Sequence, residues 1–265
     1  MNTLYVVLFF IFGTIFGSFF GVVGSRIPNN ESIVTPSSHC NKCSHKLKWY
    51  ELIPIFSYII QGGKCSKCGS SIPILYPITE LISGLLFAVS YFCFGFSTKL
   101  FIALLVASLL VIVIITDVTY LIIPDEVTLT FSILVILVKL ISLDFRGTFY
   151  SILSGILLFS LMYCIMILGN KLFKKETLGG ADIKLMFFVG LVVFPSLGIF
   201  TIFLSSCLAL PVSLYLLLKD KNSIIPYGPF ILMALFLVYC FNWKGGGSYV
   251  YIRCIRIRRF SVIPR

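Results

Sequence analysis

Apolar stretches of about 20 residues recur along the whole 265-residue chain, and they constrain its fold more than any other feature. As a helix, each stretch is long enough to cross roughly 30 Å of hydrocarbon. Hydrophobic residues make up 58% of the chain and charged residues 12%, about half the charged fraction that soluble globular domains carry. Because a soluble core could not hide so many apolar segments, the sequence predicts an all-α polytopic membrane protein.

The apolar pattern predicts about eight transmembrane helices. We expect them over residues 4–25, 75–95, 99–117, 126–143, 148–169, 183–194, 197–218 and 229–243. The first segment has no basic region before it and no small-residue cleavage site after it, so we interpret it as a retained helix and not as a signal peptide. The chain then divides into a first helix (1–25), an insertion (26–74), a seven-helix membrane domain (75–243) and a tail (244–265).

The net charge of +11 arises mainly from Lys and Arg residues in the loops between the apolar segments. This distribution is typical of topology signals and not of a nucleic-acid-binding surface. Most of these cations fall on one side of the membrane if the insertion 26–74 is cytoplasmic. The positive-inside rule therefore places the insertion in the cytoplasm and the N-terminus outside.

The tail 244–265 breaks this charge pattern, because it is basic and should lie outside after eight spans. It begins Lys-Gly-Gly-Gly-Ser, which resembles an engineered linker. We interpret it as an added sequence or a read-through product, with attachment to anionic headgroups as the functional alternative.

Two cysteine pairs mark the insertion 26–74. Cys40-x-x-Cys43 and Cys65-x-x-Cys68 bring four thiolates together on two tight turns, which suits tetrahedral Zn²⁺. Two disulfides or four free thiols are the alternatives, and disulfides are disfavoured on the cytoplasmic side. We therefore predict a small cytoplasmic tetracysteine zinc-binding domain with a closed, structural metal site between the first two helices.

Two carboxylates at span boundaries are the main catalytic candidates, because ionisable groups in membrane spans are costly. Asp117 ends the third span and Asp182 opens the sixth, on the same side of the membrane in the predicted topology. Two carboxylates brought close do not both ionise readily, which leaves one as an acid and the other as a base. Such a pair can activate water for attack on a peptide carbonyl. The chain has no HExxH motif and no Ser/His pair to support another hydrolytic mechanism.

The surrounding residues offer further candidates. Gly179, Gly180, Ala181 and Lys184 flank Asp182, and the glycines let the backbone approach an extended substrate. Secondary candidates are Asp125, Glu80 and Glu51. Purely structural roles are the alternatives: a helix-start charge for Asp182 and Asp125, a polar stop for Asp117, and a packing partner for Glu80.

These residues resemble the motifs of type IV prepilin peptidases. The run Gly179–Lys184 resembles the Gly-x-Gly-Asp box of that family, with Ala181 in place of the second glycine. Asp117, eight residues before Asp125, corresponds to the first catalytic aspartate. The resemblance covers residues 10–235 and includes further boxes at Gly17–Val23, Arg26–Pro28, Pro36–Cys40, Trp49–Tyr58, Tyr76–Glu80 and Pro226–Phe230.

The resemblance implies a bacterial inner-membrane aspartyl endopeptidase whose active site faces the cytoplasm. Its substrates would be prepilins or pseudopilins of type IV pilus, competence and type II protein secretion systems, cut after the Gly that ends a basic leader. Many members also methylate the new N-terminus with S-adenosylmethionine, an activity associated with the cysteine-bearing domain and here with Glu51. No glycine-rich nucleotide loop supports this second activity from the residues alone.

Two other classes of function stay open at this point. An ion- or proton-coupled transporter also uses membrane carboxylates, although usually near mid-span and with internal repeats. A zinc-bearing assembly factor without catalysis would keep its function when both aspartates are replaced.

Overall fold

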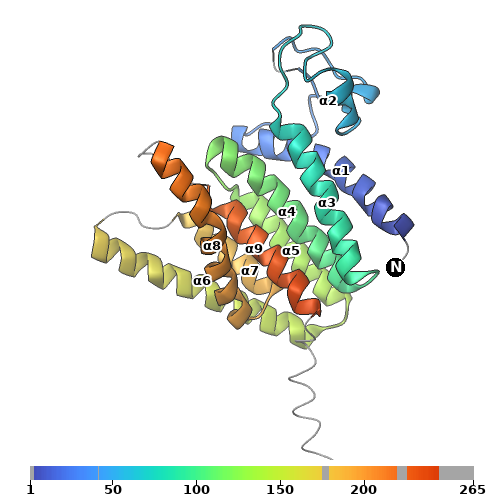
Figure 1. Cartoon of the computed structure of the whole chain (residues 1–265). Coiled ribbons are helices and arrows are strands. Elements are labelled where there is room, and N and C mark those ends of the chain that lie inside the picture. The colour runs from blue at the N-terminus through green and yellow to red at the C-terminus, as the bar shows by residue number, and fades with distance from the viewer. Residues whose placement is uncertain (1–2, 41, 175–178, 220–225, 245–265) are drawn as a thin grey trace, which may run out of the picture.

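The computed structural model describes residues 3–40, 42–174, 179–219 and 226–244, and within them it is helical with no β-strand (Figure 1). The helices are α1 (Thr3–Arg26), α2 (Phe56–Ile60), α3 (Leu75–Phe94), α4 (Thr98–Tyr120), α5 (Asp125–Ile141), α6 (Phe145–Phe173), α7 (Gly180–Val192), α8 (Pro195–Lys219) and α9 (Gly228–Lys244). Each of the eight predicted segments forms one of these helices. The tail expected beyond Lys244 lies outside the described residues.

Five helices of the described part are long and apolar enough to cross a membrane, namely α1, α3, α4, α6 and α8. Helix α9 is apolar over a shorter stretch, Gly228–Phe241. Helices α5 and α7 have 17 and 13 residues. At 1.5 Å per residue α7 is only about 20 Å long, too short to span the hydrocarbon alone. The structure thus supports a multi-spanning protein, while the count of eight spans stays a prediction.

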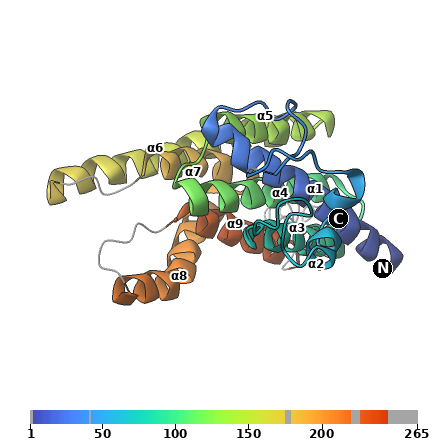
Figure 2. The same cartoon turned by 90° about the horizontal axis from the view of Figure 1, so that it is seen from above.

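Helix α4 forms the centre of the bundle. It packs against α1, α3, α5 and α9, as Figures 1 and 2 also show. Its residues Val106, Leu109 and Leu110 are completely buried. Because α4 is enclosed on several sides, Asp117 near its end is buried, while the next residue, Val118, is exposed.

Helices α1 and α3 cross at very close range through small residues. A Cβ atom added at Gly13 would lie 2.8 Å from the Cα of Gly84, and one at Gly17 would lie 2.9 Å from the Cα of Glu80. Membrane helices use such small residues because they let two backbones approach without a hydrophobic driving force between them. The glycine spacing in α1 therefore fixes how α1 sits on α3.

We expect Gly17→Leu to disturb this crossing, because no space exists for the new side chain against α3. Overpacking of this kind costs about 1–3 kcal/mol. Thermal unfolding of the detergent-solubilised protein should show a lower midpoint than wild type. The change Phe12→Leu on the same helix is the control, since Phe12 is 57% exposed. Equal midpoints for Gly17→Leu and Phe12→Leu would contradict this account of the packing.

The far end of the short helix α7 is tied to its neighbours. Gly190 of α7 packs directly on Gly155 of α6, where a Cβ would come within 2.5 Å of the Gly155 Cα. The Lys139 Nζ donates a hydrogen bond of 2.6 Å to the Leu191 carbonyl, and the Ser154 hydroxyl donates one of 3.1 Å to the Val193 carbonyl. These contacts fix the position of α7 and hence of the residues at its beginning.

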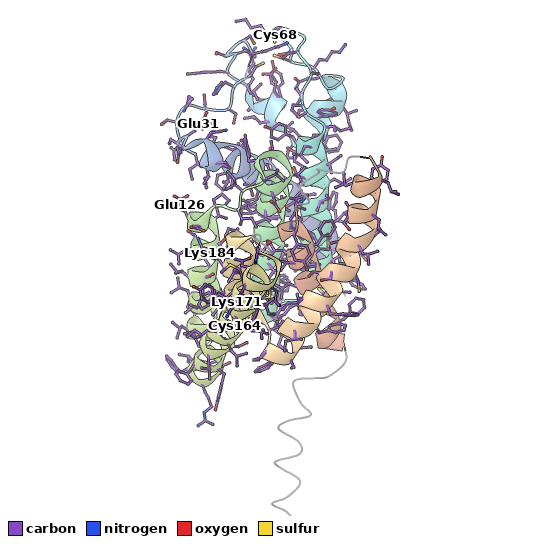
Figure 3. The ribbon with its side chains drawn as sticks, turned by 90° about the vertical axis from the view of Figure 1, so that its left-hand side faces the viewer. Glu31, Cys68, Glu126, Cys164, Lys171 and Lys184 are labelled. Carbon is purple, nitrogen blue, oxygen red and sulfur yellow. The ribbon has the colours of Figure 1, made fainter. Side chains whose placement is uncertain are left out.

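The insertion between α1 and α3 contains the short helix α2, two 3-10 turns (Ile27–Asn29 and Trp49–Leu52) and two isolated β-bridges. It forms the projection at the top of Figure 1, and Cys68 lies at its tip in Figure 3. The insertion therefore stands out from the helix bundle, while the division of the chain into domains stays a prediction.

Candidate active site and cysteine cluster

One end of the bundle gathers the ends of several helices that are distant in sequence. The Tyr120 hydroxyl at the end of α4 donates a hydrogen bond of 3.3 Å to the Ser25 carbonyl near the end of α1. The Asn29 side-chain amide in turn donates one of 3.1 Å to the Tyr120 hydroxyl. The beginnings of α5, α7 and α9 lie at the same end, as the contacts below establish.

Asp117 lies in the last turn of α4 and is 7% exposed. Its Oδ2 accepts a hydrogen bond of 3.1 Å from the backbone N–H of Gly228, the first residue of α9. This bond crosses 111 positions in sequence and orients the carboxylate. A buried carboxylate held by one backbone donor is an unusual end for a membrane helix, and it agrees with a functional role.

Gly228 is a site residue to which the sequence reasoning gave no role. A Cβ atom at this position would lie 2.6 Å from the Ile123 Cδ1 and 3.1 Å from the Asp117 Oδ2. A side chain here would crowd the Asp117 carboxylate and displace the Ile123 side chain, so glycine suits the close approach of α9. The available signal is the order Gly228-Pro229, because proline is common in the first turn of a helix and marks where α9 begins.

Asp182 lies in the first turn of α7 and follows the helix-capping residue Gly179 in the sequence. Its backbone N–H donates a hydrogen bond of 3.2 Å to the Gly179 carbonyl. The side chain is partly exposed. A Cβ at Gly179 would be 3.3 Å from the Asp182 Oδ2, so the carboxylate turns back toward the chain that precedes the helix.

The two aspartates stand at the same end of the bundle, where the end of α4 and the beginnings of α5, α7 and α9 come together. Helix α9 packs against both of the helices that carry the aspartates, α4 and α7. Asp117 is buried and anchored, whereas Asp182 is more accessible. The arrangement therefore combines two carboxylates in different environments, which is what an acid and a base of the same residue type require.

The glycines before Asp182 leave open space. Among the residues that the structure describes, nothing lies within 4 Å of a Cβ built on Gly180, and both Gly179 and Gly180 are exposed. Ala181 is partly buried and packs against the core. An extended peptide could thus approach the backbone at Gly180 without a clash.

Lys184 pairs with a secondary candidate. Its Nζ lies 2.6 Å from the Asp125 Oδ2 at the beginning of α5, and both side chains are more than half exposed. The ion pair links the beginnings of α5 and α7 beside Asp182, although exposed pairs stabilise little. Figure 3 shows Lys184 near this end of the bundle, below Glu126.

Glu80 directs its carboxylate at the insertion. Its Oε2 accepts a hydrogen bond of 2.7 Å from the backbone N–H of Ile55, and the Ser18 hydroxyl of α1 also contacts it. Ile55 has a left-handed backbone (φ 63°) where α2 begins. The structure therefore gives Glu80 a partner in the insertion, where it stabilises a turn.

The four cysteines of the insertion form one cluster. Their Sγ atoms all lie within 4.8 Å of one another, with 3.8 Å between Cys40 and Cys68 and 4.0 Å between Cys43 and Cys65. A tetrahedral zinc site with Zn–S bonds of about 2.3 Å has sulfur atoms about 3.8 Å apart. These separations exceed the S–S bond of about 2.05 Å in a disulfide, and the four thiols are free. The donor set and its spacing fit a divalent metal.

The two cysteine turns share one hydrogen-bond pattern. The Ser44 N–H donates to the Cys40 carbonyl and the Gly69 N–H to the Cys65 carbonyl, each at 2.9 Å. Ser44 and Gly69 both have left-handed backbones, with φ of 54° and 68°. The Ser70 hydroxyl, 3.1 Å from the Cys68 sulfur, lowers the pKa of that thiol. The cluster is thus a pair of matching knuckles with a polar partner for its sulfurs.

Glu51 connects the two knuckles and is 7% exposed. Its carboxylate accepts hydrogen bonds from the Lys48 backbone N–H at 2.8 Å and from the Ser66 hydroxyl, and it lies 3.5 Å from the His45 Nε2. The Lys48 N–H and the Ser66 hydroxyl hold the pKa of Glu51 below its ordinary value. The structure therefore places Glu51, the residue that the family resemblance associates with methyl transfer, inside the cysteine domain, where its contacts link the two knuckles.

A groove of about 390 Å³ separates α1 from the segment 49–56 of the insertion. Its lining is mainly aromatic and aliphatic, with Thr14 and Ser18 as hydroxyl-bearing members. S-adenosylmethionine carries a charged amino acid group, a sulfonium and a ribose, which need polar partners. The groove does not fit that cofactor, and we derive no methyl-transfer step through it.

Two family models match the chain. The model for the "Bacterial Peptidase A24 N-terminal domain" matches residues 11–94, which contain the cysteine cluster, Glu51 and Glu80. The model for the "Type IV leader peptidase family" matches residues 104–214, which contain Asp117 and Asp182. Both candidate sites thus fall inside matched regions.

Several curated proteins are similar to the chain. The "Prepilin leader peptidase/N-methyltransferase" of Bacillus subtilis (strain 168) is 38% identical over 188 residues, which cover 70% of this chain and 73% of that protein. A protein of the same name from Xanthomonas campestris pv. campestris is 31% identical, covering 80% of this chain and 75% of its own length. The one from Vibrio cholerae is 28% identical over 90% of this chain and 98% of the relative. No solved structure gives a significant match.

Proposed function

The chain belongs to the type IV leader peptidase family, and on this premise we propose that it is a membrane aspartyl endopeptidase whose catalytic pair is Asp117 and Asp182. The observation that carries the proposal is the position of these two carboxylates at one end of the bundle, on the two helices, α4 and α7, that both pack against α9. Each stands at the end of a different helix, and the Gly228 N–H orients one of them. A pair of acids in unequal environments, with an open backbone beside it, suits acid–base cleavage of an extended peptide.

In the proposed reaction, the ionised member of the pair accepts a proton from water while the water oxygen forms a bond to the carbonyl carbon of the peptide. The protonated member donates a hydrogen bond to the carbonyl oxygen. It then supplies the proton that the leaving amine needs when the C–N bond breaks. The two aspartates titrate as one coupled unit, so the roles belong to the pair.

The substrates are prepilins or pseudopilins, and the cut follows the Gly that ends their basic leader. The names of the similar proteins support this substrate class. An extended leader segment would lie along Gly179 and Gly180, since both are exposed and no described residue lies within 4 Å of a Cβ built on Gly180. The small leader Gly at the cut site would suit an approach this close to the backbone.

We further propose eight membrane crossings in a bacterial inner membrane, with the insertion and the catalytic end on the cytoplasmic side. The loop cations support this orientation through the positive-inside rule. Zn²⁺ would be held by Cys40, Cys43, Cys65 and Cys68, where it would cross-link the two knuckles without taking part in peptide cleavage. The relatives' names support a second proposed activity, methylation of the new N-terminus with S-adenosylmethionine, to which we assign no residue.

The transporter alternative is not favoured. A coupled transporter places its binding carboxylates near mid-span between repeats, whereas Asp117 and Asp182 stand at helix ends on one side. The peptidase family membership of the chain points away from transport as well.

The test is incubation of the purified, lipid-reconstituted wild-type protein with a prepilin, followed by mass spectrometry of the product N-terminus. We expect cleavage immediately after the leader Gly. With S-adenosylmethionine present, a mass increase of one CH₂ on the product would reveal methylation. A folded wild-type protein that cuts none of several prepilins and pseudopilins would refute the proposed function.

A further inference from the structure

The segment 49–60 of the insertion presents large apolar side chains on its surface. Trp49 is 78% exposed, Phe56 66%, Ile59 68% and Ile60 84%. Tyr50, Leu52 and Ile53 are also exposed. A water-soluble domain seldom leaves a contiguous apolar patch of this kind uncovered, so this patch marks an interaction surface.

The part of the segment up to Phe56 lies against the side of α1. It forms one wall of the groove whose other wall is α1 from Phe10 to Ser18. At 1.5 Å per residue, these positions lie about 12–24 Å along the helix from its last residue, Arg26. The hydrogen bond from Ile55 to Glu80, in the second turn of α3, places the segment below the beginning of that helix too.

The backbone N–H groups at the turn of the segment have hydrogen-bond partners within the protein, as a water-free environment requires. In hydrocarbon, a non-helical turn is tolerated only where its polar groups find partners within the protein. The Ile55 N–H, at the left-handed turn, donates to the Glu80 carboxylate. The next two N–H groups donate to the Pro54 and Ile53 carbonyls at 2.6 and 3.0 Å.

The wall formed by α1 continues the patch. Ile11 is 48% exposed and Ile15 53%, and both line the groove. They belong to a helix that is long and apolar enough to span the membrane, so its exposed side faces lipid. The apolar surface of residues 49–60 is thus continuous with a lipid-facing surface, which identifies the bilayer as its partner.

Charged and aromatic residues mark where the segment would leave the hydrocarbon. Lys46 and Lys48 precede the patch and Lys64 follows it, and all three are exposed. The Lys48 ammonium lies 5.7 Å above the ring of Tyr50. Trp and Tyr concentrate at membrane interfaces, and Lys attracts anionic headgroups.

We propose that the exposed apolar side chains of residues 49–60 are embedded in the lipid bilayer while Glu51 faces the cysteine domain, with phospholipid acyl chains filling the groove between this segment and α1. The flanking lysines contact the headgroups, and Glu80 accepts the hydrogen bond of the buried turn. The cysteine domain is therefore anchored beside α1 by its own apolar loop. This inference concerns the membrane contact alone and does not depend on the peptidase activity.

Trp49 offers a direct test, because the chain has two Trp residues and Trp243→Phe leaves Trp49 alone. The variant is reconstituted in vesicles of phosphatidylcholine and phosphatidylglycerol, with and without bromine on the acyl chains. We expect Trp49 emission to shift to shorter wavelength than in water. Brominated acyl chains should quench it strongly, and iodide in the aqueous phase should quench it weakly. If Trp243→Phe does not insert, Trp243→Tyr serves the same purpose.

The control carries its reporter at the tip of the insertion. In a chain with Trp49→Phe and Trp243→Phe, the change Lys67→Trp puts a tryptophan next to Cys68, far from the helices in Figure 3. Iodide should quench this residue and brominated lipid should not. The proposal is overturned if Trp49 behaves like this control. It is equally overturned if Trp49 is shielded from both quenchers, because a second copy or another protein would then cover the patch.

Discussion

Replacing either aspartate of the pair by asparagine should abolish leader cleavage. We expect Asp117→Asn and Asp182→Asn each to lower the cleavage rate by about 10³-fold or more, because a proton donor or acceptor in the transition state contributes roughly 10²–10⁴-fold. Asparagine keeps the shape of the side chain and can still accept the Gly228 hydrogen bond at position 117. The loss would therefore reflect the missing acid–base function. The measurement is the rate at which the processed prepilin N-terminus appears by mass spectrometry.

The matched control is Asp144→Asn at the beginning of α6. Asp144 is exposed, its side chain caps the Gly147 N–H, and asparagine is as good a cap as aspartate. It should insert and cleave like wild type. The pair is refuted if either Asp117→Asn or Asp182→Asn inserts and still processes prepilin at a near-normal rate. Loss in one variant alone would leave a single catalytic carboxylate, which would need a different partner.

The helices and the cluster could be predicted from the sequence because their signals are local. An apolar run of about 20 residues specifies a helix in lipid whatever its neighbours are. Two Cys-x-x-Cys turns likewise specify two knuckles, and the Ser44 and Gly69 backbones share the same left-handed turn. Counting spans predicts Asp117 and Asp182 on one side of the membrane, and in the structure both stand at the same end of the bundle.

The partners of the site residues could not be predicted, because they depend on how distant helices meet. The Gly228 N–H meets Asp117 only after α9 packs on α4, and Lys184 meets Asp125 only after α7 packs on α5. Glu80 offered two possible roles in sequence, and its partner Ile55 comes from a segment whose fold has no periodic signal. The position of the short helix α7 could not be predicted for the same reason. It is fixed by tertiary contacts such as the hydrogen bond from Lys139 to the Leu191 carbonyl, and not by the length of the helix.

Removing one cysteine of the cluster should release the metal and unfold the knuckles. We expect wild type to carry about one Zn²⁺ per chain and Cys65→Ser to carry almost none, because a serine hydroxyl is not a thiolate ligand. Cys65 is the buried member of the four. Binding of structural zinc in small domains is worth about 10–16 kcal/mol, more than the knuckles could otherwise recover. The measurements are metal content after purification and the rate of proteolysis within residues 26–74.

The membrane helices should survive this change, which separates the two sites. The cluster contacts neither Asp117 nor Asp182 through any of the bonds described above, and the proposed lipid anchor holds the insertion beside α1 independently of the metal. Cys164→Ser is the control, since Cys164 is a free, exposed thiol on α6. It should retain zinc and resist proteolysis as wild type does. Zinc retained by Cys65→Ser would refute the zinc site, and so would a metal-free wild-type protein whose knuckles still resist proteolysis. The cluster would then consist of four free thiols, stabilised by the hydrogen bond between Cys68 and Ser70 and by the cross-link between Glu51 and Ser66.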